Sequence, residues 1–103
     1  MKKSREPLEP KYKNDILRAL DYHFPQKKKV ILFGSRAQGT YKPGSDIDIA
    51  IDIGEPIKLH EMARTRITLE NLSVPFEVDI VDMHSIPEEL KKVILNEGIV
   101  WKS

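Results

Sequence analysis

The sequence contains no cysteine and no long hydrophobic segment. Without cysteine, neither a disulfide nor a thiolate metal site can form. The longest apolar runs are about five residues, whereas a helix that spans a membrane needs ~20. The N-terminal stretch MKKSREPLEPKYK is charged but has no apolar region of the kind found in secretory signals. We therefore expect a protein of the reducing cytoplasm with no membrane association.

An excess of positive charge is also missing. The 17 Lys and Arg residues are balanced by 16 Asp and Glu residues, which gives a net charge of +1. Nucleic-acid-binding faces usually carry a basic excess, so we expect no strong direct binding to nucleic acid. A chain of 103 residues fits one domain. We expect this domain to cover residues 1–103, with residues 1–9 as a flexible lead-in.

Hydrophobic periodicity predicts an α/β (α+β) protein with a small mixed sheet of three or more strands flanked by helices. Helical spacing covers residues 10–24 and 57–72, and a third helix is expected after Ser85, with Glu88 at capping-box spacing and Gly98 at its end. Strands are expected at residues 30–33, 46–53 and 76–81, and residues 99–101 should form a short extended piece.

The connections between these segments predict how the strands pair. A short excursion joins the first two strands, which favours an antiparallel pair, whereas a helix separates the second strand from the third and favours a parallel pair. The inward-facing positions of the last two helices are expected to be Leu59, Met62, Ala63 and Ile67 in one and Leu90, Val93 and Ile94 in the other.

Three familiar glycine-rich motifs can be excluded for the stretch ILFGSRAQGTYKPGSDIDIAID, residues 31–52. Gly34 and Gly39 have the spacing of a phosphate-binding loop, but Thr40 follows where that loop needs lysine. The dinucleotide fingerprint fails at its second glycine. A calcium loop starting at Asp46 would need glycine where Ile51 stands.

What remains is a strand that ends in Gly34-Ser35 and, after ten residues, Asp46 and Asp48 at the start of the next strand. The period of a strand places both carboxylates on one face. Two neighbouring anions repel one another, and hard divalent cations such as Mg²⁺ relieve that repulsion. Ser35 offers a hydroxyl and an N–H that suit phosphate. The combination predicts a nucleoside triphosphate site, in preference to a polar strand face exposed to water.

A third aspartate, Asp79, lies between apolar residues in the following strand. If that strand neighbours the second, Asp79 completes a carboxylate cluster able to hold two metal ions ~3.5–4 Å apart. For Asp52 a solvated or hydrogen-bonding role is favoured over metal binding. Asp82 is expected beyond the strand as a turn or cap residue, and the histidines show no metal-ligand spacing.

The motif Gly34-Ser35-x10-Asp46-x-Asp48, with "GSRAQG" and "SDIDI" in full, resembles the signature of the minimal nucleotidyltransferase domains of the DNA polymerase β superfamily. The resemblance covers nearly the whole chain, and Asp79 matches the third catalytic aspartate of that family. It implies a nucleotidyltransferase-type, palm-like fold. It also implies transfer of a nucleoside monophosphate from a triphosphate with two Mg²⁺ ions, for which Mn²⁺ can substitute, and release of pyrophosphate.

The resemblance also implies a role for each matching residue. Gly34 and Ser35 would bind the triphosphate, Asp46 and Asp48 both metals, and Asp79 the catalytic metal. Arg36 stands where such proteins often carry a basic residue, and either a phosphate contact or a surface salt bridge is open for it.

Short members of this family resemble the MntA-type antitoxins of HEPN–MNT pairs, in which the nucleotidyltransferase adenylylates a tyrosine of an all-helical HEPN ribonuclease. A domain with no room for its own acceptor-recognition unit fits such a reaction, because the partner delivers the acceptor. Two alternatives stay open. The acceptor could be a small hydroxyl compound such as an antibiotic, or the domain could plug the partner's groove without catalysis.

Overall fold

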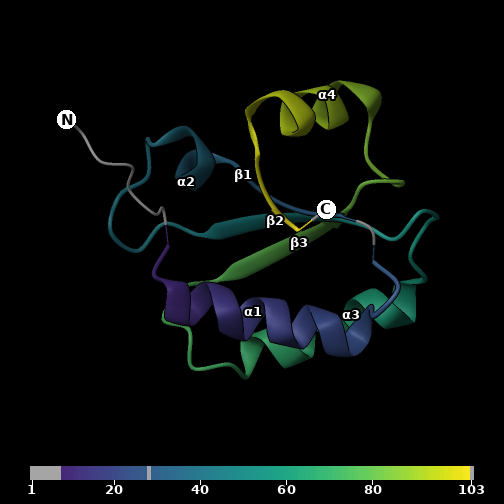
Figure 1. Ribbon diagram of the computed structural model, residues 1–103, viewed down its shortest axis with the longest axis horizontal. Helices are drawn as coiled ribbons and strands as arrows, with labels where there is room; N and C mark the ends of the chain where they lie inside the picture. The colour runs from purple at the N-terminus through teal and green to yellow at the C-terminus, as the bar shows by residue number, and fades with distance from the viewer. Residues whose placement is uncertain (1–7, 28, 103) are drawn as a thin grey trace.

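The computed structural model describes residues 8–27 and 29–102. Four helices and four strands follow one another along this part of the chain (Figure 1). Their order and bounds are α1 (Pro10–His23), β1 (Lys29–Phe33), α2 (Ser35–Gln38), β2 (Ile47–Asp52), α3 (Leu59–Glu70), β3 (Val78–Asp82), α4 (Glu88–Glu97) and β4 (Ile99–Lys102). The predicted α/β class is confirmed, and the predicted elements exist with shifts of one or two residues at most ends.

The four strands form one mixed sheet in the order β3-β2-β1-β4. β1 runs antiparallel to both β2 and β4, and β2 runs parallel to β3. Both predicted pairings are therefore confirmed, and the short extended piece at the end of the chain joins the sheet as an edge strand. The other edge strand is β3.

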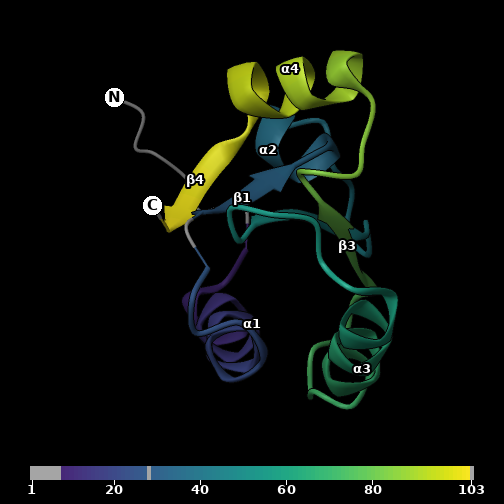
Figure 2. The ribbon, with the colours of Figure 1, turned by 90° about the vertical axis from the view of Figure 1, so that its right-hand side faces the viewer.

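Helices cover both faces of the sheet, with α1 and α3 on one side and α4 and the short α2 on the other (Figure 2). The alternation of β2 explains this arrangement, because Ile47, Ile49 and Ile51 are fully buried in the larger core cluster beneath α1 and α3. Ala50 points the other way and joins a smaller cluster with Ile94 of α4. Trp101 packs half-buried against the larger cluster.

The predicted inner stripe of α3 is wrong at all but one position. Leu59 is 87% exposed and Ile67 is 58% exposed, and Ala63 is exposed as well, whereas Met62 is buried. The helix instead turns Met62, Thr65 and Leu69 inward. The hydroxyl of Thr65 can be buried because it donates a hydrogen bond to the Glu61 carbonyl at 2.7 Å.

The predicted capping box at the start of α4 is also wrong. The residue at the N-cap is Pro87, and no side chain caps the helix. Ser85 donates its hydroxyl hydrogen to Asp82 Oδ2 at 2.7 Å instead. Within the helix Ile94 is buried and Leu90 is half-buried, but Val93 is 43% exposed. The lost capping role follows from the competing carboxylate of Asp82.

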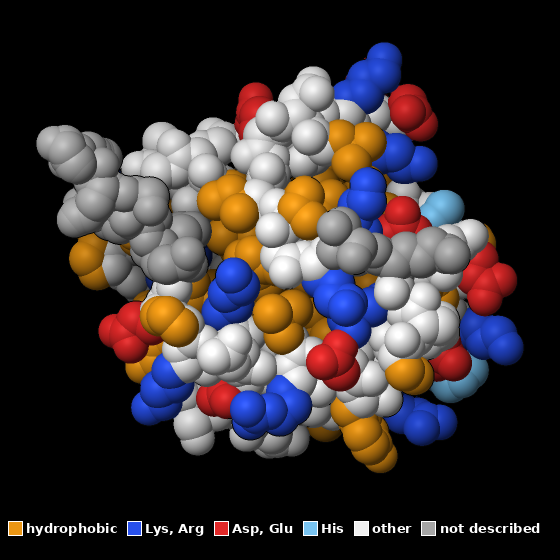
Figure 3. All heavy atoms as spheres, viewed as in Figure 1, with side chains coloured by type: hydrophobic (Ala, Val, Ile, Leu, Met, Phe, Trp, Pro, Cys, Tyr) orange, Lys and Arg blue, Asp and Glu red, His pale blue; other side chains and the backbone are white. Residues whose placement is uncertain are grey.

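The predicted flexible lead-in falls largely on residues 1–7, outside the described residues. Leu8, the first described residue, is buried in the larger core cluster, so the packed part of the chain begins before α1. Among the described residues, no helix is long and apolar enough to cross a membrane. Basic and acidic side chains are interspersed over the face shown in Figure 3, in keeping with the balanced charge of the sequence.

Candidate active site

Gly34 brings the end of β1 against the side chain of Asp48. Phe33, the last residue of β1, pairs with Asp48 of β2. Gly34 then takes φ 80° and ψ −157°, a region that is essentially restricted to glycine. A Cβ atom at this position would overlap Asp48 Oδ2 well inside van der Waals contact. Glycine is therefore required here both by the backbone conformation and by the carboxylate.

Ser35 begins the single turn of helix α2 directly after Gly34. The turn is closed by bonds from Gln38 N–H to the Gly34 carbonyl at 3.1 Å and from Thr40 N–H to the Ser35 carbonyl at 3.0 Å. Gln38 Nε2 also donates to Glu97 Oε1 at 2.8 Å, which ties the turn to the end of α4. These bonds fix Ser35 directly after Gly34, the residue that lies against Asp48.

Asp48 and Asp79 are direct neighbours in the parallel ladder between β2 and β3. Neighbouring strands are ~4.8 Å apart, and in-register residues point to the same face. This is the sheet face on which Ala50 and Val81 pack toward α4. The sequence expectation that the third strand lies beside the second is thus confirmed, and with it the proximity of these two aspartates.

Asp46 lies one residue before β2 and is exposed. Burial raises the pKa of Asp48, and the nearby charges of Asp79 and Asp46 raise that pKa further. Asp46 and Asp79 are therefore each near enough to Asp48 to act on its carboxylate. Among the described residues, however, no three carboxylate or imidazole side chains lie close enough together to hold a metal ion.

Arg36 anchors the loop that leads to Asp46. Its side chain is buried, with 5% exposure, and its Nε and Nη2 atoms donate to the Ser45 carbonyl at 3.2 and 3.0 Å. The guanidinium also lies 4.4 Å from the ring centre of Phe76 and 4.9 Å from that of Tyr41. This positioning role of Arg36 was not predicted from the sequence, and a phosphate contact by Arg36 stays a prediction.

The sequence model of the family described as "Polymerase beta, Nucleotidyltransferase" matches residues 14–103. This chain belongs to the polymerase β nucleotidyltransferase family. The resemblance drawn from the Gly-Ser and Asp-x-Asp motifs is therefore confirmed, and so is the fold that it implied.

Two relatives and one solved structure show which branch of the nucleotidyltransferase family this chain is similar to. A Methanocaldococcus jannaschii candidate protein adenylyltransferase is 39% identical over 72 residues, which are 70% of this chain and 76% of that protein. Protein adenylyltransferase MntA of Shewanella oneidensis is 33% identical over 82% of this chain but 60% of its own length. A crystal structure of a toxin–antitoxin complex with AMP-PNP has a TM-score of 0.76 at 28% identity, over 87% of this chain and 73% of that one.

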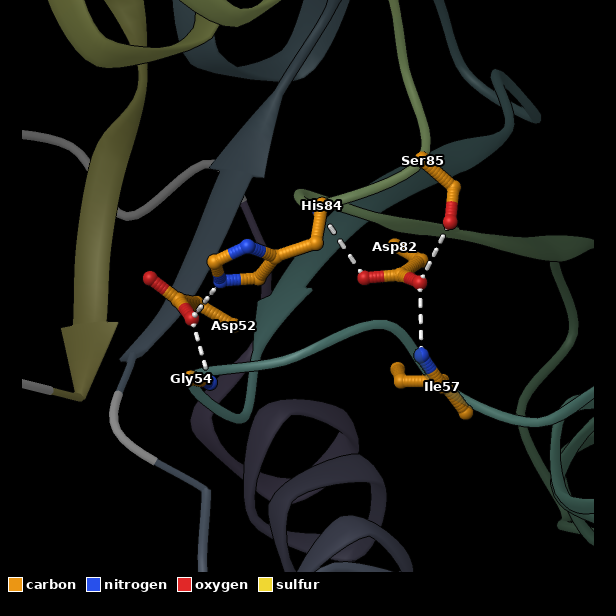
Figure 4. A network of polar contacts seen from close by, with 6 residues as sticks. All are labelled: Asp52, Gly54, Ile57, Asp82, His84 and Ser85. Atoms are coloured by element: carbon orange, nitrogen blue, oxygen red, sulfur yellow. Dashed lines mark hydrogen bonds and ion pairs between the residues drawn. The ribbon is translucent and has the colours of Figure 1, made fainter.

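A second polar cluster lies at the opposite end of β2 of this nucleotidyltransferase (Figure 4). Asp52 Oδ1 accepts hydrogen bonds from Gly54 N–H at 2.7 Å and from His84 Nε2 at 2.8 Å. Partial burial by itself would raise the pKa of Asp52, but the Gly54 bond, the bond and charge of His84 and the charge of Lys29 together lower it. The predicted hydrogen-bonding role of Asp52 is confirmed.

Asp82 was expected beyond the strand, but it is the last residue of β3 and is 5% exposed. It accepts hydrogen bonds from Ile57 N–H at 2.8 Å, His84 N–H at 2.9 Å and the Ser85 hydroxyl at 2.7 Å (Figure 4). Asp82 therefore ties the loop that enters α3 to the turn that enters α4. The predicted turn role of Asp82 is confirmed, but its predicted position beyond the strand is wrong. A buried carboxylate of this kind needs such donors.

Proposed function

We propose that this protein is a Mg²⁺-dependent protein adenylyltransferase that moves AMP from ATP to a tyrosine hydroxyl of an all-helical HEPN partner and so acts as its antitoxin in the cytoplasm. The observation that carries the proposal is the in-register pair of Asp48 and Asp79 beside Gly34. Support also comes from family membership, from relatives named as protein adenylyltransferases, and from the similar toxin–antitoxin complex with AMP-PNP.

The donor chemistry of the aspartates fits a divalent cation. Burial and neighbouring negative charge disfavour ionisation of Asp48, and a bound cation would remove that penalty. Mg²⁺ is usually held by one or two carboxylates together with substrate phosphates and water. Asp48 and Asp79, with Asp46 one residue before the strand, would supply those carboxylates, and Mn²⁺ would fit the same oxygen ligands. When bound, the metal would offset the negative charge of the reacting phosphates.

Three residues around Asp48 would bind the phosphate chain and position the loop that leads to Asp46. Gly34 leaves the space next to the carboxylate open, and the hydroxyl and N–H of Ser35 would donate hydrogen bonds to the phosphate chain. Arg36 holds the Ser45 carbonyl and thereby fixes the approach to Asp46. A phosphate contact by Arg36 is retained as part of the proposal.

The proposed reaction is an in-line exchange at the α-phosphorus of ATP. The acceptor oxygen forms a bond to that phosphorus while the bond to the bridging oxygen breaks, and pyrophosphate leaves with the bonding electrons. The proton of the acceptor hydroxyl passes to Asp79 or to solvent. Asp79 is suited to this position because it is exposed on an edge strand, where an acceptor from another protein can approach it.

Nucleotide binding tests the first half of the proposal. Calorimetry should detect ATP binding with Mg²⁺ or Mn²⁺ and none with EDTA. Ser35→Ala should cost about 0.5–1.5 kcal/mol, the worth of one hydrogen bond. Asp46→Asn should weaken binding more, because a neutral amide is a poor metal ligand. Equal ATP affinity with and without EDTA would count against the metal-dependent site.

Label transfer tests the second half. With the purified HEPN partner and Mg²⁺, label from ATP marked at the α-phosphate should become covalently attached to the partner, whereas label at the γ-phosphate should not. A partner that stays unlabelled, although it binds this protein and ATP is present, would leave the small-molecule acceptor or the non-catalytic plug as the explanation.

A further inference from the structure

Strand β3 forms one edge of the sheet, so only one of its two sides is bonded to a neighbouring strand. Its register with β2 pairs Ile47 with Val78 and Ile49 with Ile80. Ile47 N–H donates to the Glu77 carbonyl at 2.8 Å. Because bonding to the neighbour alternates along a parallel ladder, the N–H and C=O groups of Val78 and Ile80 point away from β2. These groups face the free edge, where a further strand could bond to them.

The free side of β3 is covered only loosely by the rest of the described chain. Arg66 Nη2 lies 3.5 Å from the Ile80 carbonyl, at the outer limit of a hydrogen bond, and no other described residue bonds to the outward groups of Val78 or Ile80. The opposite edge strand, β4, pairs with β1 through an irregularity between Val30 and Ile31, a feature that hinders further pairing at an edge. β3 is therefore the edge better suited to an added strand.

Two hollows lie along this edge, between β3 and α3. One, of about 250 Å³, is lined by Ile80 and by apolar side chains that include Leu59 and Met62. The other, of about 330 Å³, is lined by Val78 among others. Arg66 belongs to the lining of both. Alternate side chains of an added strand share one face, so two of them, two residues apart, can enter the two hollows.

Both hollows lie on the α3 side of the sheet. Met62 in the smaller lining and Phe76 in the larger one pack in the larger core cluster on that side. Asp48 and Asp79, by contrast, share the face on which Ala50 packs toward α4. A strand added along β3 would therefore fill the two hollows and leave the face proposed for the nucleotide open.

The charge at this edge determines which kind of segment fits it. Glu70, Glu77 and Asp79 contribute to the lining of the larger hollow, against the single guanidinium of Arg66. A basic side chain can lay its aliphatic part on the apolar wall and direct its charge to the exposed glutamates. A second copy of this chain, paired through its own β3, is disfavoured because residues 77–82, EVDIVD, are acidic and include no basic residue.

We propose that the free edge of β3, with the two hollows beside it, is a docking site for an extended, positively charged segment of a partner protein. The segment adds a strand antiparallel to β3, the direction with the slightly more stable pairing. An apolar side chain enters the smaller hollow, and a Lys or Arg two residues away enters the larger one. The inference goes beyond the proposed function, because such docking needs neither nucleotide nor AMP transfer.

Peptide binding followed by NMR, without nucleotide, tests this site. The probe is acetyl-Thr-Lys-Thr-Leu-Thr-Lys-Thr-amide, in which Lys precedes and follows Leu at the required spacing. It should shift the backbone amides of residues 62–70 and 78–82 and bind on the order of tenfold more tightly than the same peptide with Glu in place of Lys. N-methylation of the leucine amide removes an N–H that faces β3 and should weaken binding about fivefold.

Charge reversal on the protein tests the selection of basic segments. Joint replacement Glu70→Lys and Glu77→Lys should reverse the preference between the Lys and Glu peptides. The matched control is Glu55→Lys, the same charge change at an exposed loop residue beyond the end of β2, which should leave the preference unchanged. An unchanged preference in the double variant would overturn the assigned role of the two glutamates and with it the proposal.

Val78→Pro tests the added strand from the side of the protein. Val78 is the first residue of β3, and its N–H does not bond to β2, so the sheet can accept proline there. The outward N–H is lost, and binding of the Lys peptide should weaken about fivefold. Amide spectra should show that the remaining fold is retained. If this variant does not fold, the N-methylated peptide gives the decisive comparison.

Four results would overturn the proposal: no binding of the Lys peptide, equal binding of the Lys and Glu peptides, no effect of N-methylation, or shifts centred on β4. Sedimentation supplies a further test. A dimer that Val78→Pro converts to a monomer would show that a second copy occupies the edge, which also contradicts the proposal. Since the titration contains no ATP, its outcome does not depend on whether this protein transfers AMP.

Discussion

Replacing Gly34 with alanine tests how closely the end of β1 is matched to Asp48. A residue with a Cβ that adopts the backbone angles of Gly34 destabilises the fold by about 1–3 kcal/mol. The new methyl group would also occupy the position of Asp48 Oδ2, so the carboxylate must move away. A side chain displaced by even 1 Å from a reacting geometry can cost about 10²-fold in rate. Gly34→Ala should therefore lose both stability and nearly all AMP transfer.

Gly39→Ala is the matched control, because Gly39 closes the same turn with φ 80° and ψ 10°. A Cβ there would meet no heavy atom within 4 Å, so only the left-handed conformation is penalised, by about 1–2 kcal/mol. For a chain of this length 1 kcal/mol corresponds to a Tm shift of about 4 °C. Both variants should melt earlier, and urea unfolding should show a loss of free energy for Gly34→Ala at least as large as that for Gly39→Ala.

The two variants should differ in activity. Measured below the melting range of both, Gly39→Ala should keep AMP transfer within about twofold of the wild type, whereas Gly34→Ala should fall by about 10²-fold or more. Mg²⁺-dependent binding of AMP-PNP should likewise be retained by Gly39→Ala and weakened in Gly34→Ala. If Gly34→Ala folds and still transfers AMP at the wild-type rate, the contact between Gly34 and Asp48 does not shape the site.

Three further predictions concern the aspartates at the two ends of β2 and β3. The pKa of Asp48 is raised in the folded protein, so ionisation of this carboxyl lowers stability at pH values above its ordinary pKa of 3.8. Asp48→Asn should therefore raise the Tm at pH 7 but not at pH 3, where the carboxyl is protonated in any case. Calorimetry should show that the same variant no longer binds Mg²⁺–ATP. Asp82→Ala removes the acceptor of three hydrogen bonds from a buried position and should cost about 3 kcal/mol in urea unfolding, whereas nucleotide affinity of the folded protein stays unchanged. The pKa of Asp52 is lowered in the folded protein, so its ionised carboxylate stabilises the fold above its ordinary pKa and this stabilisation is lost as the pH falls. His84→Ala should reduce the free energy of unfolding by about 0.2–1 kcal/mol near neutral pH. Melting curves recorded over a range of pH should show the acid-induced loss of stability at a higher pH in this variant.

The strand arrangement and the central pair of aspartates could be predicted from the sequence because their signals are local. The period-2 pattern of β2 fixes which side chains face the core, and a helix-length connection to β3 favours the parallel pairing that the structure has. Asp79 could then be paired with Asp48 because each occupies the polar face near the start of its strand. The end of β1 at Gly34-Ser35 could likewise be predicted from the motif.

Other features depend on contacts between distant segments, which a single sequence does not show. The inward face of α3 could not be chosen correctly because Thr65 counts as polar until its hydroxyl is seen bonded within the helix. The role of Arg36 depends on Phe76, forty residues later in the chain. Asp82 is a buried acceptor because three donors from two other segments converge on it, and this also explains why Ser85 does not cap α4.

The central claim is tested most directly by the mass of the HEPN partner after incubation with this protein, ATP and Mg²⁺. The wild type should add the mass of AMP to the partner, and peptide mapping should place it on a tyrosine. Asp79→Asn should still bind Mg²⁺–AMP-PNP through Asp46 and Asp48 and yet leave the partner unmodified. A partner that gains AMP equally with Asp79→Asn, or that gains none with the wild type, would contradict the account.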